Sequence, residues 1–395
     1  MDNKKNGIPK LRFPGFTGAW EQRKLGEVAT RVTRKNKNLE STLPLTISAQ
    51  LGLVDQISYF DKRIASSNLT NYILLNRGEF AYNKSYSNGY PFGAVKRLNR
   101  YDKGVIPSLY IAFMPNTIFI NSDFMEMYFE TSLWHKEVSA RASEGARNHG
   151  LLNISPSDFM DIYMKIPEKI EEQKKIAKFL EDFDSLIALH QRKLEHLQEQ
   201  KKGLLQKMFP KNGETVPEVR FPGFTDAWEQ RKLGEVAEIK TGSRNHQDSV
   251  DNGKYPFFVR SEKVERLNEY DFDTKAILVP GDGRIGEIFH YYDGKFALHQ
   301  RVYKVDNFKE VNPLYLLNLF KYKFKKHALR LNAQGTVPSL RLPMFTNWNI
   351  LIPNLNEQQK IGLFFQQLDS LIALHQRKLD HLELMKKGLL QQMFV

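Results

Sequence analysis

The sequence predicts an α+β protein in which two globular domains are separated by two long antiparallel coiled-coil helices, arranged as a pseudo-twofold tandem repeat. Two internal repeats and the blocks between them support this prediction. The segment DSLIALHQRKL occurs at 184–194 and again, unchanged, at 369–379. A nineteen-residue segment at 11–29 returns at 219–237 with two differences. Two blocks that do not resemble each other lie between these repeats.

Composition restricts the class of protein. The 395 residues include 58 Lys and Arg against 45 Asp and Glu, a net charge of +13. Such a surplus favours a polyanionic partner, either nucleic acid or an anionic membrane surface, although a basic solvated surface is the other interpretation. The absence of cysteine excludes disulfides, thiolate zinc sites and thiol nucleophiles. No apolar run approaches the roughly 18 residues of a membrane span, and the start has no secretory signal, so we expect a cytoplasmic protein without a membrane partner.

The repeated nineteen residues form a leader at the start of each half. Pro, Gly and aromatic residues fill its first part and predict a packed, non-helical segment followed by a short ordered element. Lys5-Asn6-Gly7 also matches Lys211-Asn212-Gly213, just after the first long helix. We therefore expect the two halves to close as a pseudo-twofold ring.

The unlike blocks, 30–166 and 238–352, are predicted to be α+β domains. Strand-like runs are predicted at 45–48, 72–75, 109–113, 276–279, 286–292 and 301–305, and helices at 122–141 and 313–331. The predicted divisions are leader plus first domain at 1–166, first helix at 167–209, leader plus second domain at 210–352, and second helix at 353–395.

The long helices begin at clear signals. Pro167 suits a first helical position, and Asn356 suits a cap. From there, apolar residues recur with steps of four and three, the period of a coiled-coil seam. The seam, which we predict to be the helix-pair and partner interface, contains Ile176, Leu180, Phe183, Ile187, His190, Leu194 and Leu197 in the first helix, and Ile361, Phe365, Leu368, Ile372, His375, Leu379 and Leu382 in the second.

Both seams continue to a lysine, Lys201 and Lys386, and then to Leu204, Met208, Leu389 and Met393. A parallel in-register pair would place lysine against lysine and His190 against His375. We therefore predict antiparallel pairing, with two independent surface helices as the alternative.

The residues from Ile166 to Ala177, with Ile-Pro followed by Glu-Gln-Lys-Lys-Ile-Ala, have a counterpart from Ile352 to Ile361. Together with the Asp-Ser-Leu-Ile core of both helices and the twin Leu-Gly-Glu-Val-Ala leaders, essentially the whole chain resembles the specificity subunit of a Type I restriction-modification enzyme. The resemblance implies two target recognition domains, each reading one half of a bipartite, asymmetric site in double-stranded DNA. It also implies that the helices dock two adenine-N6 methyltransferase subunits and, through them, restriction subunits.

The same resemblance implies a non-catalytic chain that binds no cofactor itself, with S-adenosylmethionine, ATP and Mg²⁺ in the partner subunits. We predict no metal site and no catalytic residue.

Polar and cationic loop residues are the candidates for DNA contact, because Arg pairs with guanine and Asn or Gln with adenine. In the first domain they are Arg34, Lys35, Asn83, Lys84, Ser85, Tyr86, Ser87, Tyr90, Arg147, Asn148 and His149. In the second domain they are Ser243, Arg244, Asn245, His246, Arg260, Lys263, Arg284, His299, Gln300, Gln334, Thr336, Ser339 and Arg341. Solvated loops are the alternative interpretation.

Three other functions stay open from the residues alone. A stand-alone bivalent DNA-binding regulator or architectural protein would bind specifically without partners. A self-sufficient methyltransferase or nuclease would need the weak motifs Asn312-Pro-Leu-Tyr315 or Asp273-Thr-Lys275 to be functional. A coiled-coil scaffold would show no salt-sensitive binding to DNA. Gly281 to Gly286 fits a dinucleotide-binding pattern, but we predict a turn leading into a strand.

Overall fold

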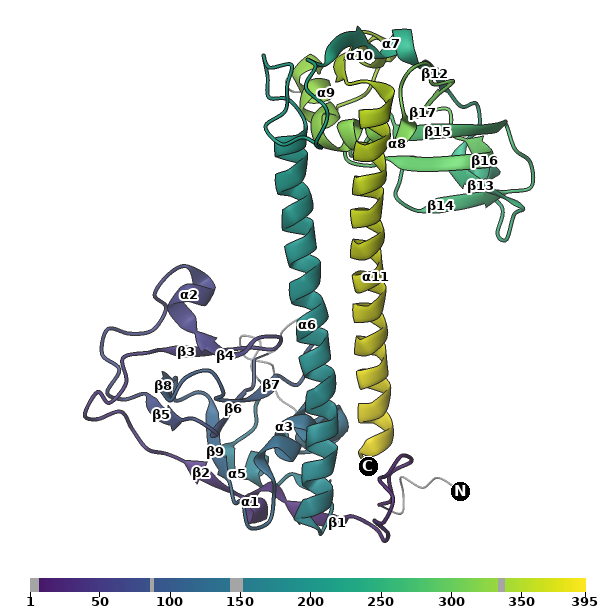
Figure 1. Ribbon diagram of the computed structural model, residues 1–395. Helices are drawn as coiled ribbons and strands as arrows, with labels where there is room; N and C mark the ends of the chain where they lie inside the picture. The colour runs from purple at the N-terminus through teal and green to yellow at the C-terminus, as the bar shows by residue number, and fades with distance from the viewer. Residues whose placement is uncertain (1–6, 86–88, 143–151, 333–337) are drawn as a thin grey trace. The chain divides into compact units, whose positions relative to one another are not determined.

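The computed structural model describes residues 7–85, 89–142, 152–332 and 338–395, which form two compact units (Figure 1). The first unit comprises Met1–Leu189 with Leu379–Val395, and the second comprises His190–Lys378. Each unit therefore combines one globular domain with parts of both long helices. Among the described residues, no helix is both long enough and apolar enough to cross a membrane.

The first domain is built around a four-stranded antiparallel sheet in the order β2-β9-β6-β7, with three two-stranded pairs, β1-β10, β3-β4 and β5-β8. Its elements are β1 (Glu21–Lys24), α1 (Leu25–Val28), β2 (Ala29–Val32), β3 (Leu45–Ser48), β4 (Gly52–Asp55), α2 (Gln56–Phe60), β5 (Ile73–Asn76), β6 (Phe80–Asn83), β7 (Ala94–Arg97), β8 (Lys103–Ile106), β9 (Ile111–Pro115), α3 (Ser122–Glu130), α4 (Leu133–Arg141), α5 (Pro156–Met160) and β10 (Tyr163–Ile166).

The second domain has a different sheet, with six strands in the order β12-β17-β15-β16-β13-β14 and a separate β11-β18 pair. Its elements are β11 (Glu229–Lys232), α7 (Leu233–Val236), β12 (Glu238–Thr241), the 3₁₀ turn η3 (His246–Asp248), β13 (Tyr255–Phe258), β14 (Val264–Leu267), β15 (Phe272–Pro280), β16 (His290–Leu298), β17 (Val302–Asp306), α8 (Pro313–Leu319), the π-helical turn η4 (Phe320–Phe324), α9 (Lys325–Leu331), α10 (Leu342–Thr346) and β18 (Asn349–Ile352).

The long helices are α6 (Ile170–Met208) and α11 (Leu355–Met393), each of 39 residues. At 1.5 Å per residue each is about 58 Å long. They start later than Pro167 and earlier than Asn356, the predicted positions. The cap of α11 is Asn354, whose Oδ1 accepts a hydrogen bond from the Glu357 amide at 3.0 Å. A cap accepts from the amide three residues on, and Asn354 is the residue at that spacing.

The leaders make the same contacts in both units. The Glu-Gln-Arg-Lys segment of each leader pairs antiparallel with the strand that precedes a long helix, Glu21 opposite Ile166 and Glu229 opposite Ile352. In the first unit the Leu11 amide donates to the Gln392 carbonyl at 3.0 Å. The leader of the first half thus lies against the end of the second helix, as the ring hypothesis predicts.

A Glu-Gln pair near the start of each long helix holds leader, domain and helix together. Glu172 accepts both hydrogen bonds of an Arg12 fork, at 2.7 and 2.9 Å, and Glu357 accepts those of Arg220, both at 2.7 Å. The two glutamates are 2% and 0% exposed. Buried carboxylates need such bidentate partners, because desolvation would otherwise favour their neutral form.

The neighbouring glutamines anchor the domains. Gln173 Oε1 accepts from the Asn121 amide at 2.7 Å, and Gln358 Oε1 accepts from the Asn312 amide at the same distance. Asn121 and Asn312 are the N-caps of α3 and α8. The same short motif therefore attaches two unlike domains to the frame in the same way.

The ends of the long helices belong to the domain cores. The main core of the first unit buries Ile176 and Leu180 from the start of α6. It also buries Met393 and Phe394 from the end of α11 and the residue after it. Met208 and Phe209, with Ile361 and Phe365, are buried in the main core of the second unit. Burial of these apolar side chains is the main stabilisation available to helices that would be marginal alone.

Side-chain contacts within each unit show antiparallel pairing, as predicted. In the first unit Lys386 Nζ lies 2.6 Å from Asp184 Oδ1. In the second, Lys201 pairs with Asp369, while His190 Nδ1 and His375 Nδ1 are 2.8 Å apart. The expectation that antiparallel pairing separates the histidines is wrong. Each lies near the middle of its seam, where an antiparallel partner presents its own middle.

Two other predictions need correction. The single helix predicted at 122–141 is broken at Thr131, whose Oγ1 donates to the Tyr128 carbonyl at 2.7 Å and whose backbone is extended. The strand predicted at 286–292 begins only at His290, because 283–289 form a turn. Gly286 has a φ of +66°, and a Cβ there would lie 2.6 Å from the Lys325 Cα, so glycine is required.

Candidate nucleic-acid interface

In the second domain, the predicted loop residues meet at the short segment between β16 and β17, His299 to Arg301. The His299 amide donates to the Phe258 carbonyl at the end of β13, at 3.0 Å. The Gln300 amide donates to the Arg244 carbonyl at 2.9 Å, and the Gly281 amide donates to the Arg301 carbonyl at 2.7 Å. The loops after β12, β13 and β15 thus converge on one segment, which we call the second-domain loop cluster.

Gly242 lets the loop after β12 lie against this segment. A Cβ at this position would be 2.0 Å from the Leu298 carbonyl oxygen and 2.8 Å from that of His299. Only glycine permits so close a backbone approach. Beyond it, Asn245 and His246 are exposed, and the Gln300 side-chain amide donates to Asn245 Oδ1 at 2.6 Å. Two exposed amides side by side match the groups that read adenine in the major groove.

Arg244 is held by two carboxylates. Its Nε lies 2.9 Å from Asp271 Oδ1, and its Nη2 lies 2.9 Å from Glu269 Oε2. Hydrogen bonds to Asp271 and then to Glu269 raise the pKa of Arg244, so the charge is fixed. The Arg244 guanidinium is thus held in one orientation, but its Nε and Nη2 groups already bind Asp271 and Glu269.

His299 is buried, with 4% of its surface exposed. Burial lowers its pKa, and the nearby Arg260 charge adds to this effect. Its Nδ1 accepts a hydrogen bond from the Arg301 amide at 2.9 Å, which places the proton on Nε2. The imidazole therefore stabilises the segment from His299 to Arg301 through this hydrogen bond.

Several predicted cations at the edge of the cluster form exposed ion pairs. Arg260 pairs with Asp282 at 3.2 Å, and Lys263 with Glu265 at 3.4 Å. Arg284 pairs with Glu262 at 3.0 Å and with Glu287 at 2.8 Å. Exposed pairs of this kind contribute little stability, so exchange for a phosphate has a small energetic cost.

The end of the domain returns to the same place. Ser339 forms a β-bridge with Asp282, and the Leu340 amide donates to the Gly281 carbonyl at 2.6 Å. Arg341 follows and is exposed. Ser243 lies in the loop after β12. The predicted Gln334 and Thr336 lie outside the described residues.

In the first domain, the predicted loop follows β6. Lys84 Nζ donates to the Ile154 carbonyl at 3.1 Å, and the Ser85 amide donates to Asn83 Oδ1 at 3.1 Å. Tyr90 is half-buried, and its carbonyl accepts from the Gly93 amide at 3.1 Å. The predicted Tyr86, Ser87, Arg147, Asn148 and His149 lie outside the described residues.

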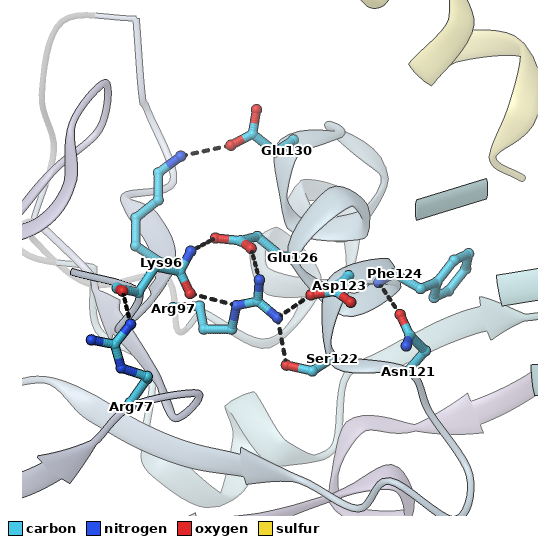
Figure 2. Close-up of polar contacts among 10 residues, drawn as sticks. Arg77, Lys96, Arg97, Asn121, Ser122, Asp123, Phe124, Glu126 and Glu130 are labelled. Carbon is cyan, nitrogen blue, oxygen red and sulfur yellow. Dashed lines mark hydrogen bonds and ion pairs between the residues drawn. The ribbon is translucent and has the colours of Figure 1, made fainter. Parts of the chain in front are cut away.

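The strand after this loop, β7, is tied to α3 by a charged network (Figure 2). Arg97 lies 2.6 Å from Asp123 Oδ1 and 2.6 Å from Glu126 Oε2. Lys96 Nζ lies 2.8 Å from Glu130 Oε1, and Glu130 also pairs with Lys386 of α11 at 3.5 Å. The strand that follows the candidate loop is thus linked through α3 to the end of a long helix in the same unit.

Arg34 and Lys35 bind their own domain. Arg34 Nη2 donates to both oxygens of Glu79, which is 4% exposed, at 3.0 and 2.8 Å. Lys35 Nζ donates to the Asn71 carbonyl and to Ser108 Oγ, both at 2.9 Å. The structure therefore places Arg34 in a structural ion pair rather than in the candidate loop.

One residue of the second-domain loop cluster is missing from the sequence prediction. Arg301 is exposed next to Gln300, and its backbone contacts both His299 and Gly281. Its position directly after two candidates could have identified it.

The weak catalytic motifs have structural roles or lie in ion pairs. Asn312 Oδ1 caps α8 by accepting from the Leu314 and Tyr315 amides at 2.9 and 3.1 Å. The Tyr315 hydroxyl, inside the core, donates to the Leu351 carbonyl at 2.5 Å. Lys275 pairs with Asp293 at 3.2 Å. Within the described ranges, no group of three or more His, Cys, Asp or Glu residues could hold a metal ion.

Known proteins resemble this chain in sequence and fold. The family model "Type I restriction modification DNA specificity domain" matches residues 94–199 and 225–384. The type I restriction enzyme MjaVIII specificity subunit of Methanocaldococcus jannaschii is 26% identical over 301 residues, which cover 67% of this chain and 68% of that protein. The EcoDI specificity subunit of Escherichia coli is 31% identical over 147 residues, 37% of this chain and only 31% of the length of that relative.

A solved S subunit of a type I restriction-modification system from M. genitalium has the same fold. It superimposes with a TM-score of 0.66 at 16% identity, over 98% of this chain and 99% of that chain. The family match covers more than half of the chain and includes parts of both domains. The chain therefore belongs to the type I restriction-modification DNA specificity family.

Proposed function

We propose that the chain reads a bipartite, asymmetric DNA site, with each domain recognising one half. The observation that carries this proposal is the contrast between frame and domains. The anchoring contacts of Glu172 and Glu357 are the same, whereas one domain has a four-stranded central sheet and the other a six-stranded one. Unlike readers on a repeated frame suit unlike half-sites at a set separation.

The second-domain loop cluster reads bases in this proposal. Asn245 and Gln300 present exposed amides for adenine, and Arg244 exchanges a carboxylate for guanine or phosphate when DNA arrives. Asp271 and Glu269 hold Arg244 in place before binding, which limits the entropy lost on association. The edge cations contribute phosphate contacts, which supply affinity and salt dependence rather than sequence choice.

The long helices dock two adenine-N6 methyltransferase subunits and, through them, restriction subunits. Support comes from apolar residues on the outer faces of the helices. Leu186 and Leu189 of α6 are 44% and 40% exposed, and Leu371 and Leu374 of α11 are 44% and 38% exposed. These four leucines occupy the same positions of the DSLIALHQRKL repeat. Repeated exposed leucines suit two copies of one partner, since apolar patches mark interaction surfaces.

Catalysis belongs to the partners in this proposal. The chain itself is non-catalytic and binds no cofactor of either reaction, because S-adenosylmethionine, ATP and Mg²⁺ bind the methyltransferase and restriction subunits. The capping role of Asn312 supports this assignment, because its side-chain oxygen is used by α8.

Mapping of methylated adenines tests the proposal. DNA from cells that carry this chain with its methyltransferase partner should be methylated at a bipartite sequence with two unlike halves. Cells with the partner but without this chain provide the control and should lack that pattern. Methylation at the same sites without this chain, or by the purified chain alone, would contradict the proposal.

A further inference from the structure

A cleft in the second unit lies apart from the loop cluster, between the end of α6 and the helical run η4–α9. Its volume is about 670 Å³, and we call it the α6–α9 cleft. Lys211 in the segment after α6 lines one wall, and Lys323, Lys326 and Arg330 line the other. The π-helical turn η4 forms part of that second wall. Such turns are rare in proteins, and those that occur are often at functional sites.

Among the described residues, the lining is cationic and includes no carboxylate, although Lys211 pairs with Glu218 outside the lining at 3.3 Å. Neighbouring lysines on the same helical run have acidic partners, since Lys321 pairs with Asp369 at 3.1 Å and Lys325 with Glu287 at 2.5 Å. Lys326 and Arg330, which line the cleft, form no ion pair with any residue that the structure describes. The uncompensated charge is thus concentrated on the side of the helix that lines the cleft.

The corresponding helix of the first unit, α4, has an arginine that is paired with a carboxylate. α4 follows α3 as α9 follows α8, and on it Arg141 Nη1 lies 2.7 Å from Glu137 Oε2. Glu137 also accepts from the Tyr163 amide at 3.1 Å. The helix of the first unit therefore neutralises its own arginine, whereas α9 leaves Arg330 available to an anion from outside the described chain.

The inner part of the cleft already desolvates a cation. Lys323 is half-buried and donates to the Pro210 carbonyl at 2.5 Å, with no carboxylate beside it among the described residues. Burial lowers the pKa of Lys323. An anion bound in the cleft would offset this desolvation, so the site favours a negatively charged ligand.

Polar side chains at the rim suit a nucleotide. The amides Gln230 and Asn347 are exposed on the lining, whereas the aromatic residues of the lining, Phe209, Trp228 and Trp348, are buried in the core. Amides bind the edges of bases, and Lys and Arg bind phosphate. These two chemistries occur together in nucleotides.

We propose that the α6–α9 cleft is a nucleotide-phosphate site, in which Lys326 and Arg330 bind the phosphate. The phosphate belongs either to the backbone of DNA held by the same chain or to a free nucleotide. The proposal does not depend on base reading by the second-domain loop cluster, because it uses other residues.

Lys326→Gln with Arg330→Gln tests the cleft in the full chain. Both side chains are exposed, so the double variant should fold, as circular dichroism can verify. Lys309→Gln with Lys360→Gln is the matched control, because it removes the same charge from exposed lysines of the same unit outside the cleft lining. The first arm measures binding of a 30-base-pair duplex by anisotropy as a function of NaCl concentration. The second measures ADP binding by tryptophan fluorescence, with adenosine as the phosphate-free comparator.

Backbone binding predicts that the slope of log affinity against log salt falls by about one to two in the cleft variant only, near 0.9 per lost phosphate contact. Binding of a free nucleotide predicts that ADP, but not adenosine, binds the wild-type chain and binds the cleft variant at least tenfold more weakly. Either result supports the site and identifies its source.

The proposal is overturned if the cleft variant matches the control in both arms. If the wild type binds DNA, and the cleft variant has the same salt slope and the same ADP binding as the wild type, the cleft proposal is rejected. The proposed function is then unaffected. A chain that binds no DNA contradicts the proposed function, and the ADP arm then decides the cleft by itself.

Discussion

Lys386 Nζ lies 2.6 Å from Asp184 Oδ1, which places a seam lysine against the first residue of the repeated segment on the other helix. Lys201 and Asp369 form the counterpart pair in the second unit. The Lys386 side chain is 12% exposed, and Glu130 adds a second carboxylate at 3.5 Å. Each lysine in the seam is therefore compensated, and the apparent defect in the heptad pattern specifies antiparallel pairing.

Lys386→Met should lower the free energy of unfolding by about 1 kcal/mol, because it leaves two carboxylates with fewer partners and the pair is partly screened by solvent. Urea denaturation of the full chain measures the change. Lys387→Met is the matched control, because this neighbouring lysine is exposed. Combining Lys386→Asp with Asp184→Lys should recover part of the loss that Lys386→Asp causes alone. Additive losses in that double variant would disprove the pairing.

The histidine pair should make the second unit sensitive to acid. One Nδ1 must donate to the other across 2.8 Å, so protonation of the accepting ring brings two N–H groups face to face. Burial first, and then the charges of His190, Lys193 and Lys378, lower the pKa of His375 from 6.5. The unfolded chain therefore binds the proton more readily. Stability is complete above about pH 6.5 and is lost as the pH falls below it.

His375→Gln should reduce this loss, measured as the difference in melting temperature between pH 7.5 and pH 5.5. His381→Gln, which changes an exposed histidine on the same helix, should keep the wild-type pH dependence. Equal pH dependence in His375→Gln and wild type would show that His375 does not cause the loss of stability in acid.

Exchange of one domain should change one half of the DNA target. The exchange is made between the leader and Pro167, or between the second leader and Pro353, with a domain from a relative of different target. The anchoring contacts of Glu172 and Glu357 stay in place, so the other domain should be undisturbed. Maps of methylated adenines provide the measurement, and a change in both half-sites would contradict modular recognition.

Insertion of one heptad in both long helices should lengthen the spacing between half-sites by about three base pairs, because seven residues add roughly 10 Å. Placing the insertions after Leu194 and Leu379 keeps the seam period. A five-residue insertion turns the following residues by about 140°, which breaks that period and should abolish methylation. If the seven-residue insertion left the spacing unchanged, the helices would not set the separation.

Substitution of the exposed leucines should weaken partner docking without unfolding the chain. Leu186→Glu with Leu371→Glu changes equivalent positions that are each 44% exposed. We expect at least a tenfold loss of affinity for the methyltransferase subunit, with an unchanged melting temperature. Leu384→Glu, at a position 68% exposed outside the repeated segment, is the control. Equal binding by both variants would exclude this surface as the docking site.

Much of the frame could be predicted from the sequence because its signals are local and occur twice. The seam period, the leaders and the Glu-Gln motif each lie within a few residues. Its helix starts were misplaced by a few positions, since Asn354 and Asn356 are equally good caps by type. The break at Thr131 depends on one side-chain hydrogen bond that no periodicity reveals.

The candidate site was less accessible to sequence reasoning, because charged side chains find partners far along the chain. Arg34 pairs with Glu79, 45 residues away, and Arg244 with Asp271, 27 residues away. Sequence shows that a loop is cationic but not which cation is already neutralised. The contrast between Lys325 and Lys326, adjacent in sequence and different in partners, required the fold.

The two copies of the repeated segment differ in the charged residue that each domain places beside them. In each domain this residue lies nine positions after the N-cap that contacts the glutamine of the long helix. Glu130 lies nine positions after Asn121, and Lys321 lies nine after Asn312. Lys386 therefore has a second acid beside its aspartate, whereas Asp369 has a second base beside its lysine. Two segments with identical letters carry opposite local charge. A protein that binds both segments can therefore distinguish them by their local charge, even though their sequences are identical.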